Sequence, residues 1–143
     1  MKFLKGTLIF LAVLTIVYFS GPHPNKPIYN KSLPAIPSDL KEIELYVNQN
    51  ESKLNIKPNN QARIIWANDS IKEKTTYVLL YLHGFSASQE EGNPVHRDFA
   101  KKFGCNLYLA RLAEHGLVSD EPMKEMTADN LWNSALEAYA IAK

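Results

Sequence analysis

The run Thr76–Leu82, TYVLLYL, limits the fold of this chain more than any other feature of the sequence. Every residue after the threonine is apolar or aromatic, and no polar residue alternates with them. A strand with one face in water would alternate, so this run predicts a strand that is covered on both faces, as in a parallel sheet. His83 and Gly84 follow directly and end the run.

The segments around this run predict alternating strands and helices. Capping residues or apolar residues at helical spacing indicate helices at 39–54, 94–103 and 127–143. Short apolar runs indicate further strands at about 63–67 and 105–112. Strands that alternate with helices predict an α/β fold with a mostly parallel sheet and flanking helices.

Two of these helices carry predicted N-caps. Asp39 precedes the first, and Glu42 stands three residues later, which is the spacing of a capping box. Thr127 precedes the last helix, but Asn130 stands where Glu or Gln would complete the box. The sequence therefore predicts only half of a capping box there.

The N-terminal segment 1–21 is predicted to lie outside the folded domain. Lys2 and Lys5 precede the apolar run Thr7–Phe19, which is the layout of a signal peptide or a slightly short membrane anchor. The lysines predict a cytoplasmic N-terminus, so the main domain, 39–143, is expected outside the cytoplasm. The segment between them, 22–38, contains five prolines and predicts an extended linker.

Composition excludes several classes of function. A formal net charge of +1 gives no basic field for nucleic acid. One cysteine, Cys105, excludes an internal disulfide framework and a cysteine-rich zinc site. The chain has no glycine-rich phosphate loop, so we expect no nucleotide, and we expect neither a cofactor nor a metal. The adjacent Glu90 and Glu91 are predicted to lie in a solvated loop.

The residues His83-Gly84-Phe85 carry the chemistry that the sequence predicts. Gly84 lacks a Cβ atom, so the chain can turn sharply and a ligand can approach its backbone. The Phe85 N–H can then point into the crevice at the carboxyl end of the sheet, where α/β folds bind ligands. A backbone N–H fixed there stabilises the oxyanion of an acyl-transfer intermediate. His83 is expected to support the loop rather than to act as a base.

The segments LLYLHGFSAS, HRDFAKKFGCNLYLARLAEHG and TADNLWNSALEAYAIAK together resemble the N-terminal half of an α/β-hydrolase of the lipase/esterase type, over about residues 60–143. The resemblance implies that Phe85 donates one oxyanion-hole hydrogen bond. It also implies that the final helix leads into the strand before the nucleophile. The run Arg111–Gly116 is only similar to the family's pattern, so no catalytic role is assigned to His115.

The family's G-x-S-x-G nucleophile elbow does not occur in this sequence. An alternative makes Ser86 the nucleophile, because Gly84–Ser88 reads G-x-S-x-S, but Gly92, Asn93 and Pro94 interrupt the helix that should follow. The expected nucleophile, acid and histidine therefore lie beyond Lys143, and the chain is expected to be the N-terminal part of a longer protein.

The leading functional hypothesis is an exported or membrane-anchored serine hydrolase that acts on small or lipid-like carboxylic esters. The 143 residues alone are expected to be inactive. Two alternatives stay open: a non-catalytic binding protein that keeps the α/β scaffold, and an inactive fragment. The expected partners are the ester substrate and, through the N-terminal segment, a membrane.

Overall fold

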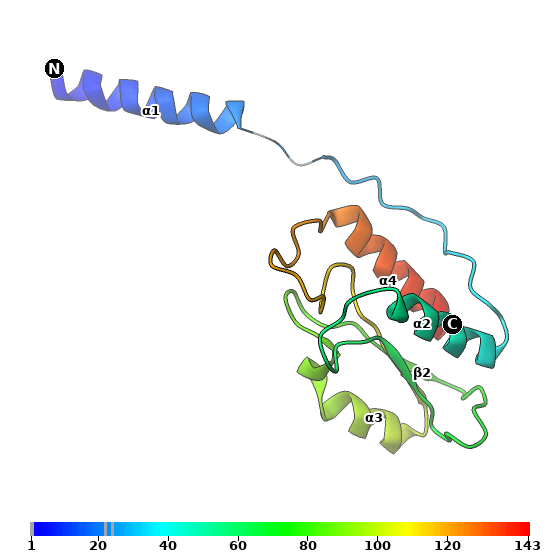
Figure 1. Ribbon diagram of the computed structural model, residues 1–143. Helices are drawn as coiled ribbons and strands as arrows, with labels where there is room; N and C mark the ends of the chain where they lie inside the picture. Colours follow the sequence, from blue (N-terminus) through cyan, green and yellow to red (C-terminus); the bar gives the residue numbers. More distant parts are fainter. Residues whose placement is uncertain (1, 22, 24) are drawn as a thin grey trace.

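A computed structural model describes residues 2–21, 23 and 25–143. The first helix, α1 (Lys2–Ser20), stands apart from the rest of the described chain (Figure 1). Its window Phe3–Ser20 has a mean hydropathy of 1.9 and is not buried at all. By length and composition α1 is apolar enough to be a signal sequence or a membrane anchor. Of the predicted linker, residues 22 and 24 lie outside the described residues.

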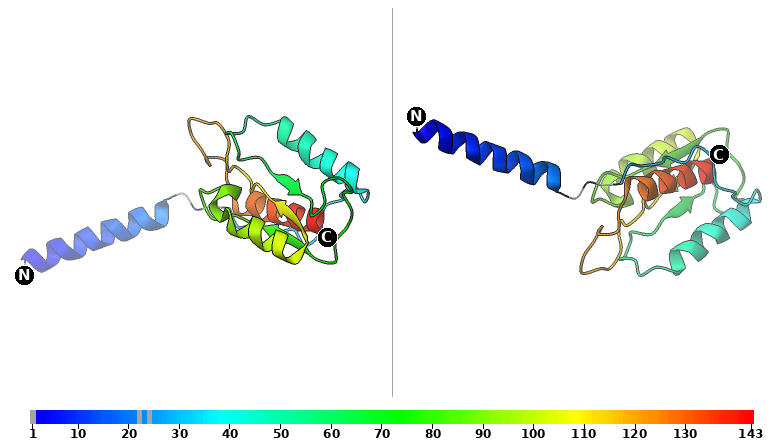
Figure 2. Two further views of the ribbon diagram at one scale, coloured as in Figure 1. Left: turned by 90° about the horizontal axis from the view of Figure 1, so that it is seen from below. Right: turned by 90° about the horizontal axis from the view of Figure 1, so that it is seen from above.

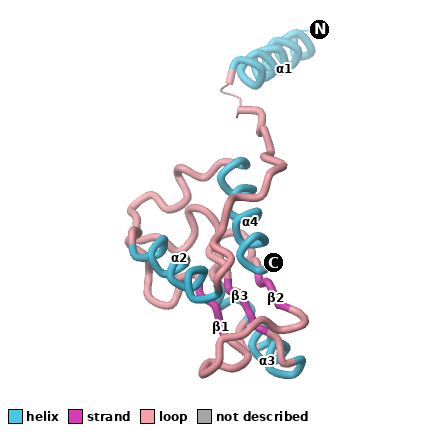
Figure 3. The backbone as a smooth tube through the Cα atoms, turned by 90° about the vertical axis from the view of Figure 1, so that its right-hand side faces the viewer, coloured by secondary structure: helices cyan, strands magenta, loops and turns pink. Residues whose placement is uncertain are grey.

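The sheet has three short strands, β1 (Arg63–Ile65), β2 (Val78–Tyr81) and β3 (Asn106–Leu109), in the order β1-β3-β2 (Figure 3). β3 is parallel to β2 and antiparallel to β1. The predicted α/β class is confirmed at this coarse level, but the expectation of a mostly parallel sheet was wrong: the described sheet is mixed, because β1 runs antiparallel to β3. Because β2 and β3 are parallel, their carboxyl ends lie at the same edge of the sheet, and the loops that follow them become neighbours.

Helices cover both faces of the sheet (Figure 2). α3 (Val95–Phe103) covers one face, while α2 (Leu40–Ser52) and α4 (Ala128–Ala142) cover the other. Alternate residues of β3 serve the two layers, since successive side chains of a strand point to opposite faces. Two buried clusters result: Ala100, Cys105, Leu107 and Leu109 under α3, and Ile43, Val47, Ala62, Tyr108, Ala110, Ala138 and Ile141 under α2 and α4.

The strand buried on both faces is β3 rather than β2. Leu107 and Leu109 in β3 are 0% exposed, whereas Val78 in β2 is 42% exposed. The expectation of full burial for Thr76–Leu82 was wrong because β2 lies at an edge of the described sheet. An apolar run alone does not reveal which strand takes the centre, since both runs are rich in leucine and tyrosine.

The helix ends follow local capping chemistry. Asp39 Oδ1 accepts the N–H groups of Lys41 and Glu42 at 2.9 and 3.2 Å, which starts α2. At α4, Thr127 Oγ1 accepts the Asn130 N–H at 3.1 Å, and Asn130 Oδ1 accepts the Thr127 N–H at 2.8 Å. The prediction of half a box was wrong here, because an amide oxygen on the shorter Asn side chain also reaches the N-cap N–H.

The linker lies against α4 rather than running free through solvent. Asp129 Oδ1 accepts the N–H groups of Ile28 and Tyr29 at 2.8 and 3.0 Å. Trp132 Nε1 donates to the Asn30 carbonyl at 2.7 Å, and the Tyr29 and Trp132 rings meet edge to face. These contacts tie the linker to the first two turns of α4 on its way to α2 (Figure 1).

Candidate functional site

In the loop after β2, two hydrogen bonds to the Gly84 carbonyl fix the peptide unit that joins Gly84 to Phe85. The Gly84 carbonyl accepts a hydrogen bond from His83 Nδ1 at 2.9 Å and another from the Ala87 N–H at 3.2 Å. A peptide unit is planar, so two donors on its C=O also fix the direction of its N–H. That N–H belongs to Phe85. His83 therefore acts on the Phe85 N–H through the shared peptide plane.

The N–H groups on either side of Phe85 are both occupied. The Gly84 N–H donates to Glu91 Oε2 at 2.7 Å, and the Ser86 N–H donates to His115 Nε2 at 3.1 Å. Between them, the Phe85 N–H donates to no acceptor within the described part of the chain. Gly84, Phe85 and Ser86 are all exposed, Phe85 by 75%, so this stretch of the chain lies at the surface. The geometry leaves one oriented N–H for an external acceptor.

Two histidines cross-link the loops after β2 and β3. His83, in the first loop, accepts the Leu112 N–H of the second loop at Nε2, over 3.1 Å. His115, in the second loop, accepts the Ser86 N–H of the first loop at its own Nε2. The ring centroids lie 4.8 Å apart at an interplanar angle of 60°, and both side chains are buried. Each loop thus supplies one imidazole and one backbone donor, and we call this arrangement the histidine clasp.

The hydrogen-bond partners assign the protons of the clasp. Each Nδ1 faces a carbonyl oxygen, that of Gly84 for His83 and that of Ala113 for His115, at 2.9 and 2.7 Å. A carbonyl only accepts, so each Nδ1 carries the proton and each Nε2 offers its lone pair to a backbone N–H. Both rings are therefore neutral, with every nitrogen engaged. Neither has a lone pair left to take a proton from a nucleophile.

Burial keeps His83 neutral. Desolvation is the main cause that lowers the pKa of His83, and the nearby His115 and Arg111 lower that pKa further. The Gly84 carbonyl and the Glu91 carboxylate act in the opposite direction on the same pKa and are outweighed.

A largely buried ion pair fixes the second loop to α2. The Arg111 guanidinium binds the Glu51 carboxylate with Nη2 to Oε1 at 2.9 Å and Nε to Oε2 at 3.0 Å. Glu51 Oε2 also accepts the Ala62 N–H, at 2.8 Å. Arg111 Nη1 donates to the His115 carbonyl at 3.3 Å, so the ion pair reaches the histidine clasp itself. Bidentate geometry of this kind adds direction as well as energy.

His83, Gly84 and Phe85 are consecutive and lie in the loop directly after β2, and the roles given to them from the sequence stay predictions. Ser86 has φ of 59°, in the left-handed region, and is followed by the short 3-10 helix η1 (Gln89–Gly92) rather than by an α-helix. Its neighbouring imidazole nitrogen, His115 Nε2, already accepts the Ser86 N–H. The role of nucleophile for Ser86 stays a prediction that this geometry does not favour.

Sequence patterns pointed to no role for Glu91 or His115 in this site. Glu91 is exposed, as expected for a solvated loop, but its carboxylate also orients the Gly84 N–H and accepts a hydrogen bond from the Tyr81 hydroxyl at 3.4 Å. His115 received no role, yet it holds Ser86. No spacing rule links these residues to the His-Gly pair, because their contacts depend on how two separate loops fold over each other. Among the described residues, no group of three His, Cys, Asp or Glu could hold a metal ion.

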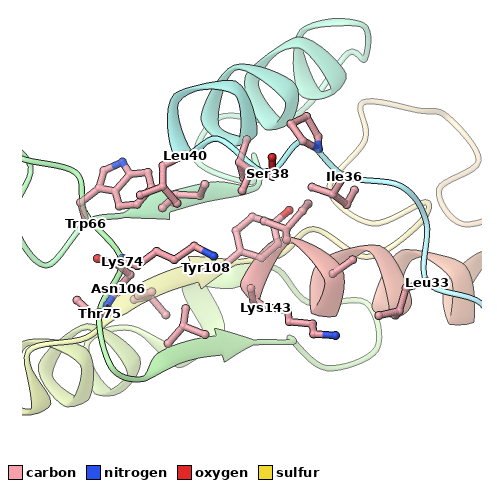
Figure 4. Close-up of a pocket in the computed structure, with 18 of the residues that line it drawn as sticks. Leu33, Ile36, Ser38, Leu40, Trp66, Lys74, Thr75, Asn106, Tyr108 and Lys143 are labelled. Atoms are coloured by element: carbon pink, nitrogen blue, oxygen red, sulfur yellow. Dashed lines mark hydrogen bonds between the residues drawn. The ribbon is translucent and has the colours of Figure 1, made fainter.

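Two cavities of the domain lie away from this loop. One, of about 400 Å³, lies between the linker, α2 and the C-terminal end of α4, with Trp66, Tyr108 and Lys143 among its lining residues (Figure 4). A second, of about 500 Å³, lies between α2 and α4. Neither is lined by His83, Gly84 or Phe85. We therefore place the candidate site by its hydrogen-bond chemistry rather than by cavity size.

Comparison with known proteins found no matching family model, no matching curated protein and no matching solved structure.

The Arg111–Glu51 ion pair, which contacts the histidine clasp through the His115 carbonyl, should contribute strongly to stability. In Arg111→Met, the Glu51 carboxylate stays largely buried with only the Ala62 N–H as partner, and we expect the free energy of unfolding to fall by about 3–5 kcal/mol. Lys124→Met is the control, since it breaks an exposed pair with Glu121 and should change stability little. Chemical denaturation of the full chain in detergent micelles measures both. Equal losses in the two variants would contradict the role given to Arg111.

The clasp should make stability depend on pH. Because burial lowers the pKa of folded His83, the unfolded chain takes up a proton first, near its ordinary pKa of about 6.5. The contribution is fully present above that pH and is lost as the pH falls below it. In His83→Gln, the amide oxygen can accept the Leu112 N–H without titrating. We expect the loss of stability between about pH 7 and pH 5 to be smaller in this variant than in the wild type.

His23→Gln provides the matched control, because His23 is exposed in the linker. Its pH dependence of unfolding should equal that of the wild type. A His83→Gln protein that loses stability on acidification as steeply as the wild type would refute the assignment of a neutral, buried His83.

Proposed function

We propose that this chain is the N-terminal part of an exported or membrane-anchored serine hydrolase that acts on carboxylic esters and resembles the α/β-hydrolases of the lipase/esterase type. The observation that carries the proposal is the Phe85 N–H, which is oriented through the Gly84 carbonyl and has no acceptor within the described chain, while both neighbouring N–H groups are occupied. Phe85 is the position that the His-Gly-X resemblance names as oxyanion donor.

Ester hydrolysis by a serine passes through a tetrahedral intermediate whose former carbonyl oxygen becomes negatively charged. A donor that is fixed in advance stabilises this oxyanion without reorganising during the reaction, and removing one such donor costs about 3–4 kcal/mol of transition-state stabilisation. The double contact on the Gly84 carbonyl supports this role in a second way. Hydrogen bonds to the C=O polarise the same peptide unit and make its N–H a stronger donor.

The position of the loop supports the proposal as well. It follows β2, which runs parallel to β3, so it stands at the carboxyl edge of the sheet, where open α/β folds bind ligands. The clasp supplies support but no base, because both imidazoles use all their nitrogens. The proposal therefore assigns the nucleophile, the acid and the catalytic histidine to chain beyond Lys143, with the serine in a G-x-S-x-G elbow.

The coding sequence after the Lys143 codon provides the first test of this proposal. An apolar strand and a G-x-S-x-G elbow, followed later by an acid and a histidine, are expected there. A downstream segment that keeps the strand but replaces the elbow serine would overturn the proposal of a hydrolase. It would favour a non-catalytic binding protein that keeps the α/β scaffold.

Phe85→Pro tests the donor in the protein that the whole coding sequence specifies. Proline removes the N–H, which bonds no group of the described chain, so the loop loses no internal hydrogen bond. We expect kcat for a p-nitrophenyl ester to fall by about 10²- to 10³-fold. Phe85→Ala is the matched control, because it changes the side chain and keeps the N–H. A similar fall in both variants, with folding verified by circular dichroism, would contradict the role of the Phe85 N–H.

A further inference from the structure

One exposed patch joins the linker to the first turns of α4. It consists of Lys26, Ile28, Tyr29, Lys31 and Trp132, and we call it the linker surface. Ile28 is 87% exposed and Trp132 is 42% exposed. The hydrogen bonds of the Ile28 and Tyr29 N–H groups to Asp129, and of the Trp132 indole to Asn30, hold the patch together. These apolar side chains are therefore fixed in place, and they do not pack into the core.

The chain keeps this surface close to α1. Ile28 is only eight residues beyond Ser20, the last residue of the apolar helix, so the connection spans at most about 29 Å even when fully extended. α1 has 19 residues and a length of about 28 Å, close to the hydrocarbon thickness of a bilayer. If α1 spans a membrane, Ser20 lies near the edge of the hydrocarbon layer and the linker surface lies in or just above the headgroups.

The composition of the linker surface suits that position. Tyr and Trp are enriched where membranes meet water, because their rings are apolar and their polar tips stay hydrogen-bonded. Ile28 adds an apolar side chain that the described residues leave 87% exposed. Lys26 and Lys31 flank the aromatic pair, are exposed, and carry the charge that attracts lipid phosphates.

We propose that the linker surface docks on the headgroup layer of the membrane that holds α1. This inference rests on the membrane anchoring proposed above, and its test does not depend on the esterase activity. The docked surface holds the domain in one orientation instead of letting it swing on a free linker.

The docking also explains how the candidate site would meet an ester in the membrane. Ser134, two residues after Trp132, accepts the Ala113 N–H at Oγ over 3.0 Å. The Ala113 carbonyl in turn accepts from His115 of the histidine clasp. The loop after β3 and the linker surface therefore share the first turns of α4. Docking brings this end of the sheet toward the lipid, which deepens the proposed substrate class to esters that reside in the membrane.

Tryptophan quenching by brominated lipids tests the docking on the full chain reconstituted in vesicles of phosphatidylcholine with some phosphatidylserine. The chain has two tryptophans, Trp132 in the linker surface and Trp66, which is buried within the domain. We expect Trp132 to lose emission when bromine is placed near the headgroups, and to lose less when bromine is placed near the chain ends. Trp132→Phe should remove the quenchable emission, and Trp66→Phe should keep it.

Flotation of the vesicles separates the two proposals. A chain that floats but shows no quenching in the wild type or in Trp66→Phe would overturn the docking and leave the anchor intact. A chain that fails to float would overturn the anchor and the docking together. Neither result bears on the oxyanion donor, which the Phe85 variants test. Reliance on Trp66→Phe and the wild type keeps the test valid if Trp132→Phe does not fold.

Discussion

The candidate site depends on two neutral imidazoles that exchange hydrogen bonds between neighbouring loops. His83 accepts from the loop that carries His115, and His115 accepts from the loop that carries His83. Each ring also donates to a carbonyl of its own loop, so neither can rotate without losing two hydrogen bonds. An unpaired buried polar group costs about 1–3 kcal/mol, and the clasp therefore holds the Gly84–Phe85 peptide in one orientation.

The scaffold makes the clasp possible. Parallel pairing of β2 and β3 brings the loops that follow them to the same edge of the sheet, and the Arg111–Glu51 ion pair fixes the second of these loops to α2. Steric contacts also favour glycine at position 84 in the first loop. A Cβ atom on Gly84 would lie 3.1 Å from Glu91 Oε1, so a larger residue would push against the carboxylate that orients the Gly84 N–H. The Phe85 N–H is thus left without an acceptor in the described chain, while hydrogen bonds hold the residues on either side of it.

Local signals in the sequence were enough for the elements and for part of the site. The apolar runs predicted β2 and β3, the Asp39 and Thr127 caps predicted two helix starts, and the His-Gly pair marked the turn before Phe85. What failed depends on contacts between distant segments. The sequence did not show that β3 takes the centre of the sheet, or that Glu91 and His115 hold the turn, since only the packing of one loop over the other decides this.

Nitrogen-15 NMR of the histidine side chains tests the clasp most directly. The full chain in detergent micelles has four histidines, and exposed His23 is an internal reference for a ring that is free to exchange tautomers. The account predicts that His83 and His115 both carry their proton on Nδ1 at neutral pH, with Nε2 bare and hydrogen-bonded. A proton on Nε2 of either ring would contradict it, because that nitrogen could then no longer accept the backbone N–H that the site requires.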